Sequence, residues 1–160
     1  MPKAFQKDVG KVVTHVSDEM QKELTPEQIY EVFNKEYVDI RQPLKLEFYK
    51  TATIDPENDI ISVEANIEYD NKKYIIEGIG NGVVSAFCSG IAKIIDVSFD
   101  IIDYRGHSLT VGTNSRAISY IEMSDKNGKL YYGAGTSSSV GKSSLRAVVS
   151  TLNKIINSNN

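Results

Sequence analysis

The chain has 160 residues, 41% of them hydrophobic, which suits one main domain with a small appendage. Its formal net charge is −3, and its 18 Lys and Arg are scattered, so we expect no nucleic-acid partner. No apolar run approaches the roughly 20 residues of a membrane-spanning helix, and the N-terminus lacks the apolar stretch of a signal peptide. We therefore expect a cytoplasmic protein with no membrane partner.

In the first part of the chain, the spacing of the apolar residues indicates two helices. Apolar residues recur at helical spacing from Phe5 to Met20. Thr25, Pro26 and Gln28 then form a capping box with proline at the first helical position. A helical pair is predicted over residues 3–38, within a helical linker subdomain of residues 1–43. From Leu44 onward apolar and polar residues alternate, as in a strand. This change of period predicts a domain boundary before Leu44.

The remainder of the chain contains one pattern twice. Strands are predicted over residues 44–54, 60–69 and 73–78, followed by an apolar helix that reaches Ile95. Strands over residues 98–109, 115–123 and 129–133 follow, with a helix over Leu145–Ile156. An offset of about 55 residues aligns Gly78-Ile79-Gly80 with Gly133-Ala134-Gly135. The fold class is therefore α+β, with two pseudo-symmetric βββα units (44–96 and 98–157) forming one domain of residues 44–157.

Three sequence features suggest chemistry that their context disfavours. Residues 135–143 end in Gly-Lys-Ser, but the spacing fails the phosphate-loop motif by one residue, and the preceding strands look antiparallel. Neither His15 nor His107 has a neighbour at metal-ligand spacing, so no metal site is expected. His107 is interpreted as a polar strand-end residue rather than a hydrolase base. The single cysteine, Cys88, is interpreted as a buried structural thiol.

The segment Gly78-Ile79-Gly80-Asn81-Gly82 leads a strand directly into a helix. The first backbone N–H groups of that helix could receive a carboxylate. Alternatively, the glycines only permit a tight turn with positive φ. The spacing alone does not decide between these two interpretations.

Several motifs together resemble the C-terminal regulatory domain of 2-isopropylmalate synthases. They are residues 77–82, Asp103-Tyr104, His107, Gly112, Ala117, residues 120–122, residues 133–135, residues 144–150 and Asn153. Residues 1–42 also resemble the helical linker that precedes this domain in the family. The resemblance therefore covers nearly the whole chain.

The resemblance implies an allosteric domain that binds leucine for feedback inhibition. The family's enzyme condenses acetyl-CoA with 2-oxoisovalerate in a metal-dependent (β/α)8 barrel, which 160 residues could not hold. This chain alone is thus expected to be non-catalytic and to carry no cofactor, with the divalent metal confined to the absent barrel. The implied partners are L-leucine, a second copy of the chain in a homodimer, and the catalytic barrel.

The leucine contacts implied by the resemblance lie in both units. They are Gly80, Asn81, Gly82, Val84, Ser85, Ile101, Tyr104, Ser108, Ser115, Ala117 and Val140. The family has small apolar residues where Ser85, Ser108 and Ser115 stand, which implies a more polar pocket here. Gly106 stands where the family has an acidic residue.

Other functions remain open at this stage. The same domain in a citramalate synthase senses isoleucine, and one shifted methyl group changes affinity by only about 1–3 kcal/mol. A stand-alone dimerisation module without a ligand is a second alternative, and an enzyme acting through His107 is a third. The expected homodimer is attributed to an apolar face left exposed on the helix Leu145–Ile156.

Overall fold

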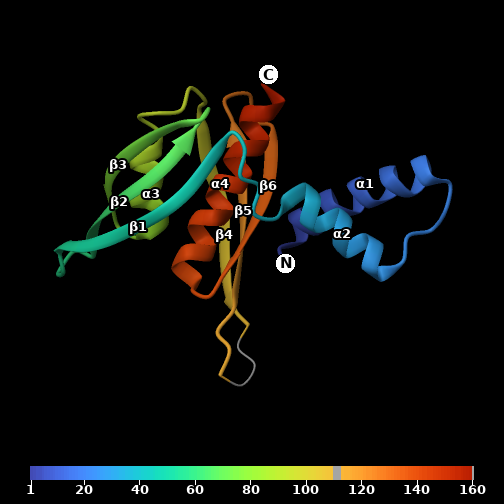
Figure 1. Ribbon diagram of the computed structural model, residues 1–160, viewed down its shortest axis with the longest axis horizontal. Coiled ribbons are helices and arrows are strands. Elements are labelled where there is room, and N and C mark those ends of the chain that lie inside the picture. The colour runs from blue at the N-terminus through green and yellow to red at the C-terminus, as the bar shows by residue number, and fades with distance from the viewer. Residues whose placement is uncertain (110–112, 160) are drawn as a thin grey trace.

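The computed structural model describes residues 1–109 and 113–159 (Figure 1). Gly112, one of the residues in the family resemblance, lies outside this description. The elements in chain order are α1 (Lys3–Met20), α2 (Pro26–Tyr37), β1 (Leu44–Asp55), β2 (Ile60–Tyr69), β3 (Lys72–Gly80), α3 (Val83–Ile91), β4 (Phe99–Ser108), β5 (Ala117–Asp125), β6 (Leu130–Ser137) and α4 (Val140–Ser158). Within the described ranges, no helix combines the length and apolar character needed to cross a membrane.

The two βββα units form a sandwich with helices in the middle. The first sheet has the order β1-β2-β3 and the second the order β4-β5-β6, all antiparallel. Helix α3 packs on the first sheet and α4 on the second, and the two helices also contact each other. One hydrophobic cluster includes residues of both sheets and both helices. The predicted α+β class with two βββα units is confirmed.

The duplication extends to an irregularity of the edge strands. The register between β1 and β2 shifts between Leu46 and Phe48, and that between β4 and β5 shifts between Ile101 and Asp103. An offset of 55 residues relates these positions. A β-bulge of this kind bends a strand and increases its local twist. Both units therefore curve their first strand at the same place.

The second glycine motif, residues 133–135, does not form the strand end predicted from the sequence. β6 continues to Ser137, so residues 133–135 lie inside a strand and the predicted strand end at residue 133 is wrong. A Cβ added at Gly135 would overlap the carbonyl oxygen of Ser143 and the backbone nitrogen of Ala147. These glycines are needed because a helix backbone lies directly on the strand, whereas a sequence alone suggests a turn.

The same contact occurs in the first unit, but at a shifted position. A Cβ added at Gly78 would overlap the carbonyl oxygen of Ala86 and approach the nitrogen of Gly90. These helix residues lie eight and twelve positions after the glycine, as Ser143 and Ala147 do after Gly135. By contact, Gly78 therefore corresponds to Gly135, which moves the predicted alignment of the two motifs by two residues.

The linker helices cover the outer face of the second sheet. Phe5, Phe33 and Tyr37 form a hydrophobic cluster with Tyr132 and Ala134 of β6. The ring centroids of Phe5 and Tyr37 lie 5.0 Å apart. The capping box predicted at the start of α2 is present in full.

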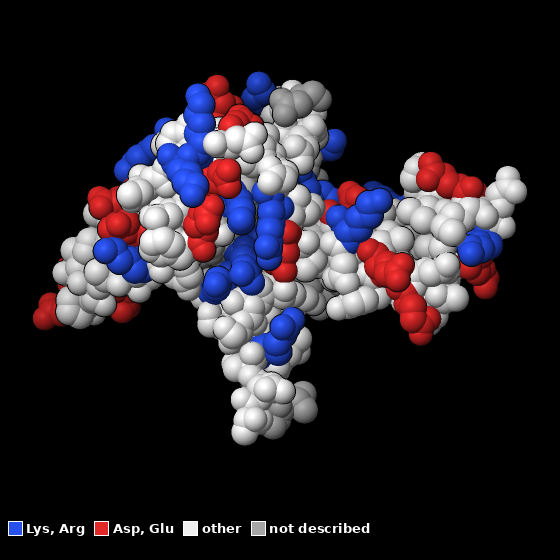
Figure 2. All heavy atoms as spheres, viewed as in Figure 1, with Lys and Arg blue, Asp and Glu red and all other residues white. Residues whose placement is uncertain are grey.

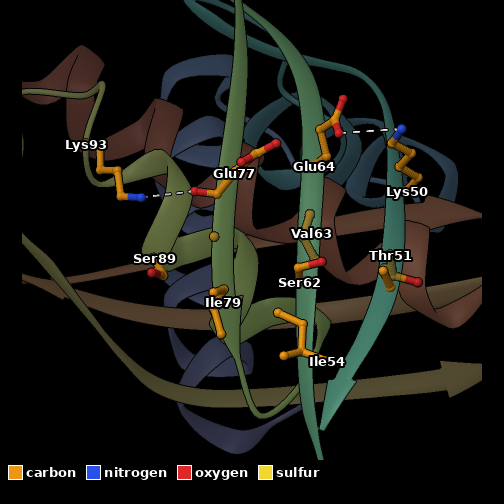
Figure 3. A pocket seen from close by; sticks show the side chains of 12 residues that line it. Lys50, Thr51, Ile54, Ser62, Val63, Glu64, Glu77, Ile79, Ser89 and Lys93 are labelled. Carbon is orange, nitrogen blue, oxygen red and sulfur yellow. Dashed lines mark hydrogen bonds and ion pairs between the residues drawn. The ribbon is translucent and has the colours of Figure 1, made fainter.

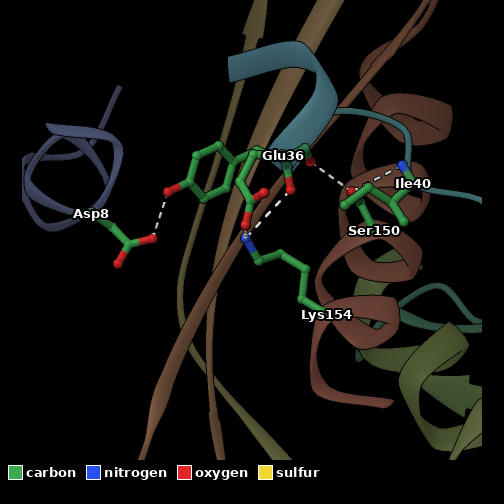
Figure 4. Close-up of polar contacts among 6 residues, drawn as sticks. Asp8, Glu36, Ile40, Ser150 and Lys154 are labelled. Carbon is green, nitrogen blue, oxygen red and sulfur yellow. Dashed lines mark hydrogen bonds and ion pairs between the residues drawn. The ribbon is translucent and has the colours of Figure 1, made fainter. Parts of the chain in front are cut away.

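Helix α4 holds the connection between the linker and the first sheet (Figure 4). The Ser150 hydroxyl donates to the carbonyl oxygen of Tyr37 (2.6 Å) and accepts from the backbone N–H of Ile40 (3.1 Å). One turn later, the Asn153 amide accepts from the N–H of Leu44 and donates to its carbonyl, both at 2.8 Å. Burial, followed by the hydrogen bond to Asp8, raises the pKa of the Tyr37 phenol.

The apolar face expected to be exposed on the helix Leu145–Ile156 is absent from α4. Twelve of its residues are buried, including Leu145, Val149, Leu152 and Ile156. The second sheet, α3 and β1 all contact this helix. An interface between two copies must therefore use another surface.

Substituting Gly135 with alanine should destabilise the fold by about 3 kcal/mol, because the new methyl group meets helix backbone that cannot move alone. Urea unfolding measures this. Gly10→Ala is the matched control: no atom lies within 4 Å of its added Cβ. In helix α1 this control should stabilise slightly, by up to about 1 kcal/mol. Equal stabilities for the two variants would contradict the assigned contact.

Substituting Asn153 with alanine should cost about 3 kcal/mol of unfolding free energy. The change leaves backbone groups of Leu44 and Ile40 without their partner in a buried position. Asn157→Ala is the matched control on the same helix, since its amide makes one exposed bond to the carbonyl of Gln42. That variant should lie within about 0.5 kcal/mol of the parent. A similar loss in both variants would refute a specific role for Asn153.

Candidate ligand site

The first group of expected ligand contacts lies at the start of α3. Gly80 is the last residue of β3, Gly82 is the N-cap, and Val84 and Ser85 belong to the first turn. Gly82 supplies no capping side chain, and its φ of −178° is extended backbone that any residue adopts. The predicted alternative of a positive-φ turn at this glycine is therefore wrong. The amides of the first turn have no side-chain cap to compete with a ligand.

The two glycines of this turn differ in their surroundings. A Cβ at Gly80 would lie 2.6 Å from the backbone nitrogen of Ala86, so this residue is needed for packing. No atom lies within 4 Å of a Cβ added at Gly82. The structural interpretation thus applies to Gly80, whereas Gly82 borders open space beside helix amides.

The second group lies around the inner face of the second sheet and the start of α4. Ser108 pairs with Ala117 across β4 and β5. The Ser115 hydroxyl donates to the carbonyl oxygen of Ser138, 2.8 Å away, just before Val140 begins α4. Tyr104 lies on this inner face, because its strand partner is buried.

The remaining candidates connect the two groups. Ile101, in β4, and Val84, in α3, both pack against the main hydrophobic cluster. The groups therefore border one shared core. Asn81 precedes the α3 N-cap and is exposed.

A buried hydroxyl cluster lies beneath Tyr104, and sequence reasoning missed it. The phenol oxygen of Tyr104 lies 2.6 Å from Ser144 Oγ, and Ser119 Oγ lies 2.8 Å from Ser143 Oγ. All three serines are fully buried. The consecutive serines at a helix start were the only signal available, and a helix start commonly carries serine for capping alone.

Gly106 lies close against this cluster. A Cβ there would approach Val140 Cγ1 to 2.9 Å and Ser119 Oγ to 3.2 Å. Any side chain at this position would have to displace its neighbours.

Another hollow lies on the outer face of the first sheet (Figure 3). It has a volume of about 670 Å³, and none of the described residues lining it is an expected leucine contact. Lys50 pairs with Glu64 at 3.5 Å, and Lys93 Nζ donates to the carbonyl oxygen of Glu77 at 3.1 Å. Both lysines of this hollow thus already have a hydrogen-bonding or ionic partner.

Lys and Arg side chains also gather in the middle of the face shown in Figure 2, among Asp and Glu. A smaller hollow of about 210 Å³ is lined by Arg41, Lys45 and Arg146, together with Asp39 and Glu47. Arg146 donates to the carbonyl oxygen of Thr136 (2.8 Å), so part of its donor capacity is already used. This mixture of signs does not define an anion site.

The other singled-out residues have ordinary structural surroundings. Residues 135–143 join an antiparallel strand to α4, and Ser139 caps that helix by accepting from the N–H of Lys142. His107 is exposed near the end of β4, as predicted. Burial raises the pKa of the Cys88 thiol to about 12, which fits a structural cysteine. Across residues 1–109 and 113–159, no cluster of His, Cys, Asp and Glu could hold a metal.

The two βββα units define an α+β domain with internal duplication. Residues 23–156 match the family model described as the LeuA allosteric (dimerisation) domain. Because this match covers most of the chain, the protein belongs to the family of LeuA allosteric (dimerisation) domains.

Relatives from three bacteria are each named 2-isopropylmalate synthase. The chain is 57% identical over 156 residues to that of Acetoanaerobium sticklandii. It is 36% identical over 157 residues to that of Clostridium acetobutylicum, and 36% identical over 159 residues to that of Brucella suis biovar 1. The matches cover 98%, 96% and 98% of this chain, but only 28% of each relative. The chain therefore spans about a quarter of the length of these synthases.

Proposed function

We propose that this chain is the leucine-binding feedback domain of a 2-isopropylmalate synthase. The observation that carries the proposal is the family match over residues 23–156, with relatives of that name covering nearly the whole chain. The parent protein would condense acetyl-CoA with 2-oxoisovalerate. Its catalytic groups and divalent metal would lie in a part of the protein outside this chain.

The open start of α3 supports recognition of an amino-acid carboxylate. Backbone N–H groups and the helix dipole favour negative charge at this end of a helix. Gly82 leaves space for the carboxylate, since no atom lies within 4 Å of its missing Cβ. The isobutyl group would pack against Val84 and Ile101, whose side chains are partly buried at the core. Burying such a side chain contributes roughly 1.5–3 kcal/mol.

Calorimetry should detect L-leucine binding to this chain, with weaker binding of isoleucine and valine. Tighter binding of isoleucine would favour the citramalate synthase alternative. No heat with any of the three would refute the proposed function and favour a dimerisation module without a ligand.

Gly82→Val should abolish leucine binding while the fold survives. The extended backbone accepts valine, and the side chain projects into space that the carboxylate would use. Gly10→Ala, at a second open glycine far along the chain, should bind like the parent. Gly80 is unsuitable for this test because substitution there disturbs α3 packing. Retained affinity in a folded Gly82→Val protein would exclude the α3 start as the carboxylate site.

We also propose that two copies associate through the outer face of the first sheet. The equivalent face of the second sheet is covered by the linker helices, but here Phe48 and Ile75 remain 56% and 67% exposed. Ile54 and Ile79 are exposed on the same face. Several exposed apolar side chains on one sheet face can form an interface with a second copy.

The cross-strand rows of residues on this face are complementary to the same rows of a second copy. The register places Phe48, Asn66 and Ile75 in one cross-strand row. The next row contains Lys50, Glu64 and Glu77. A twofold axis running along β2 would place β1 of one copy over β3 of the other. Phe48 would then face Ile75, and Lys50 would face Glu77.

Replacing Ile75 with glutamate should convert the dimer into a monomer of 17.8 kDa, as measured by sedimentation. The carboxylate would be buried against an apolar side chain of the second copy. Tyr30→Glu is the matched control, because Tyr30 is 66% exposed on the linker helix α2. A dimer that survives Ile75→Glu would assign this face to another partner, such as the catalytic part of the protein.

A further inference from the structure

The third strand of each unit, β3 or β6, is an edge strand of its sheet. The edge of β6 is partly covered, because Val38 forms a parallel bridge with Ala134. The N–H of Asp39 donates to the carbonyl oxygen of Ala134 (3.0 Å). The Asp39 carboxylate accepts from the N–H and the hydroxyl of Thr136, at 3.0 and 2.6 Å. The segment that joins α2 to β1 therefore adds a short piece of strand to the second sheet.

The correspondence of Gly78 with Gly135 determines which edge residues of the two units match. With these glycines aligned, the matching pairs are Glu77 and Ala134, Ile79 and Thr136, and Lys93 and Ser150. Ser150 is the helix residue whose hydroxyl bonds to the segment on both sides of its bridge to β6 (Figure 4). Each group that holds the added segment on β6 therefore has a counterpart at β3.

The edge of β3 carries no added strand. Among residues 1–109 and 113–159, no segment pairs with it from outside the sheet. Instead, Lys93 Nζ donates to the carbonyl oxygen of Glu77, so this carbonyl points away from β2 (Figure 3). Backbone groups alternate in direction along a strand, so the N–H of Ile79 points the same way. A lysine at a free edge is a common protection against uncontrolled strand pairing.

Hollows on both sides of Lys93 leave room along this edge. One has a volume of about 290 Å³ and is lined by Ile75 and Ile94, together with Glu77 and Lys93. The hollow of about 670 Å³ described above also includes Glu77 and Lys93. Because the two hollows share these residues, they form one groove along β3, with the lysine side chain in its middle.

We propose that the edge of β3 is a strand-addition site for a short extended peptide segment that carries an aspartate. The aspartate N–H would donate to the Glu77 carbonyl, and its carboxylate would accept from the N–H of Ile79, as Asp39 does on β6. Ile79 lacks the hydroxyl of Thr136, but the Lys93 ammonium supplies a positive charge nearby. Main-chain hydrogen bonds provide the affinity when a peptide extends a sheet.

This inference goes beyond the proposed function and does not depend on it. The added segment needs no leucine, and it takes no group from the start of α3. It would lie beside β3 in the plane of the sheet, which leaves the outer face free for a second copy.

The test titrates a capped peptide with the sequence of residues 35–41 into the isotope-labelled protein. Nuclear magnetic resonance follows the chemical shift and the hydrogen exchange of the Ile79 amide. We expect this amide to shift and its exchange to slow as the peptide is added, because the N–H gains a carboxylate partner. A short segment makes few bonds, so the dissociation constant should be on the order of 1 mM.

Two altered peptides test the predicted bonds without changing the protein. An ester in place of the amide between Val38 and Asp39 removes only the N–H that would reach Glu77, and it should weaken binding up to about tenfold. Alanine in place of the aspartate should weaken binding about tenfold or more, because a hydrogen bond to a charged group is lost. Equal binding of all three peptides would overturn the proposal.

Lys93→Glu tests the charge at the site. The preference for the aspartate peptide over the alanine peptide should fall at least about threefold, because an attractive charge becomes a repulsive one. Lys126→Glu is the matched control, since Lys126 is exposed in the turn between β5 and β6. This variant should keep the preference of the parent, and an equal fall in both variants would show a long-range charge effect and overturn the role of Lys93.

Two further outcomes would also overturn the inference. One is an Ile79 amide whose shift and exchange stay constant at every peptide concentration. The other is an Ile79 amide that becomes protected in the protein alone as its own concentration rises. That result would assign the edge of β3 to a second copy of the chain instead of a peptide.

Discussion

Burial of α4 is the constraint on which the rest of this structure depends. A helix with twelve buried residues must find partners for the polar groups among them, since an unpaired buried group costs about 1–3 kcal/mol. Ser150 and Asn153 find theirs in the connection between α2 and β1. The requirement that stabilises the core therefore also determines where the linker helices join. Sheets, linker and candidate site all take their positions from this one helix.

Local patterns predicted the elements well, because alternating and helical periods are carried by neighbouring residues. The two βββα units and the paired linker helices followed from those periods. The glycine motif after Lys129 was interpreted wrongly. A glycine required by a turn and a glycine required by a helix packed on a strand look alike in sequence. Gly135 serves the second purpose, since its missing Cβ is replaced by helix backbone.

The candidate site was predictable only where a family resemblance supplied it. Tyr104 came from that resemblance, and the structure places it on the expected strand. Its supporting serines could not be predicted, because Ser144 lies 40 positions away and contacts it only through the packing of α4 on the second sheet. The contacts of Asn153 with Leu44 span 109 positions, beyond the reach of any local pattern.

Duplication doubled the fold, but the two helix starts have diverged. Ser139 closes the start of α4 with its own hydroxyl, whereas Gly82 leaves the start of α3 without a side-chain cap. Of the two βββα units, only the first then offers uncapped helix amides to the carboxylate of an effector. On this view, the expected stoichiometry is one effector molecule per polypeptide. The second unit has kept the shape of its counterpart, but its helix start is closed by Ser139.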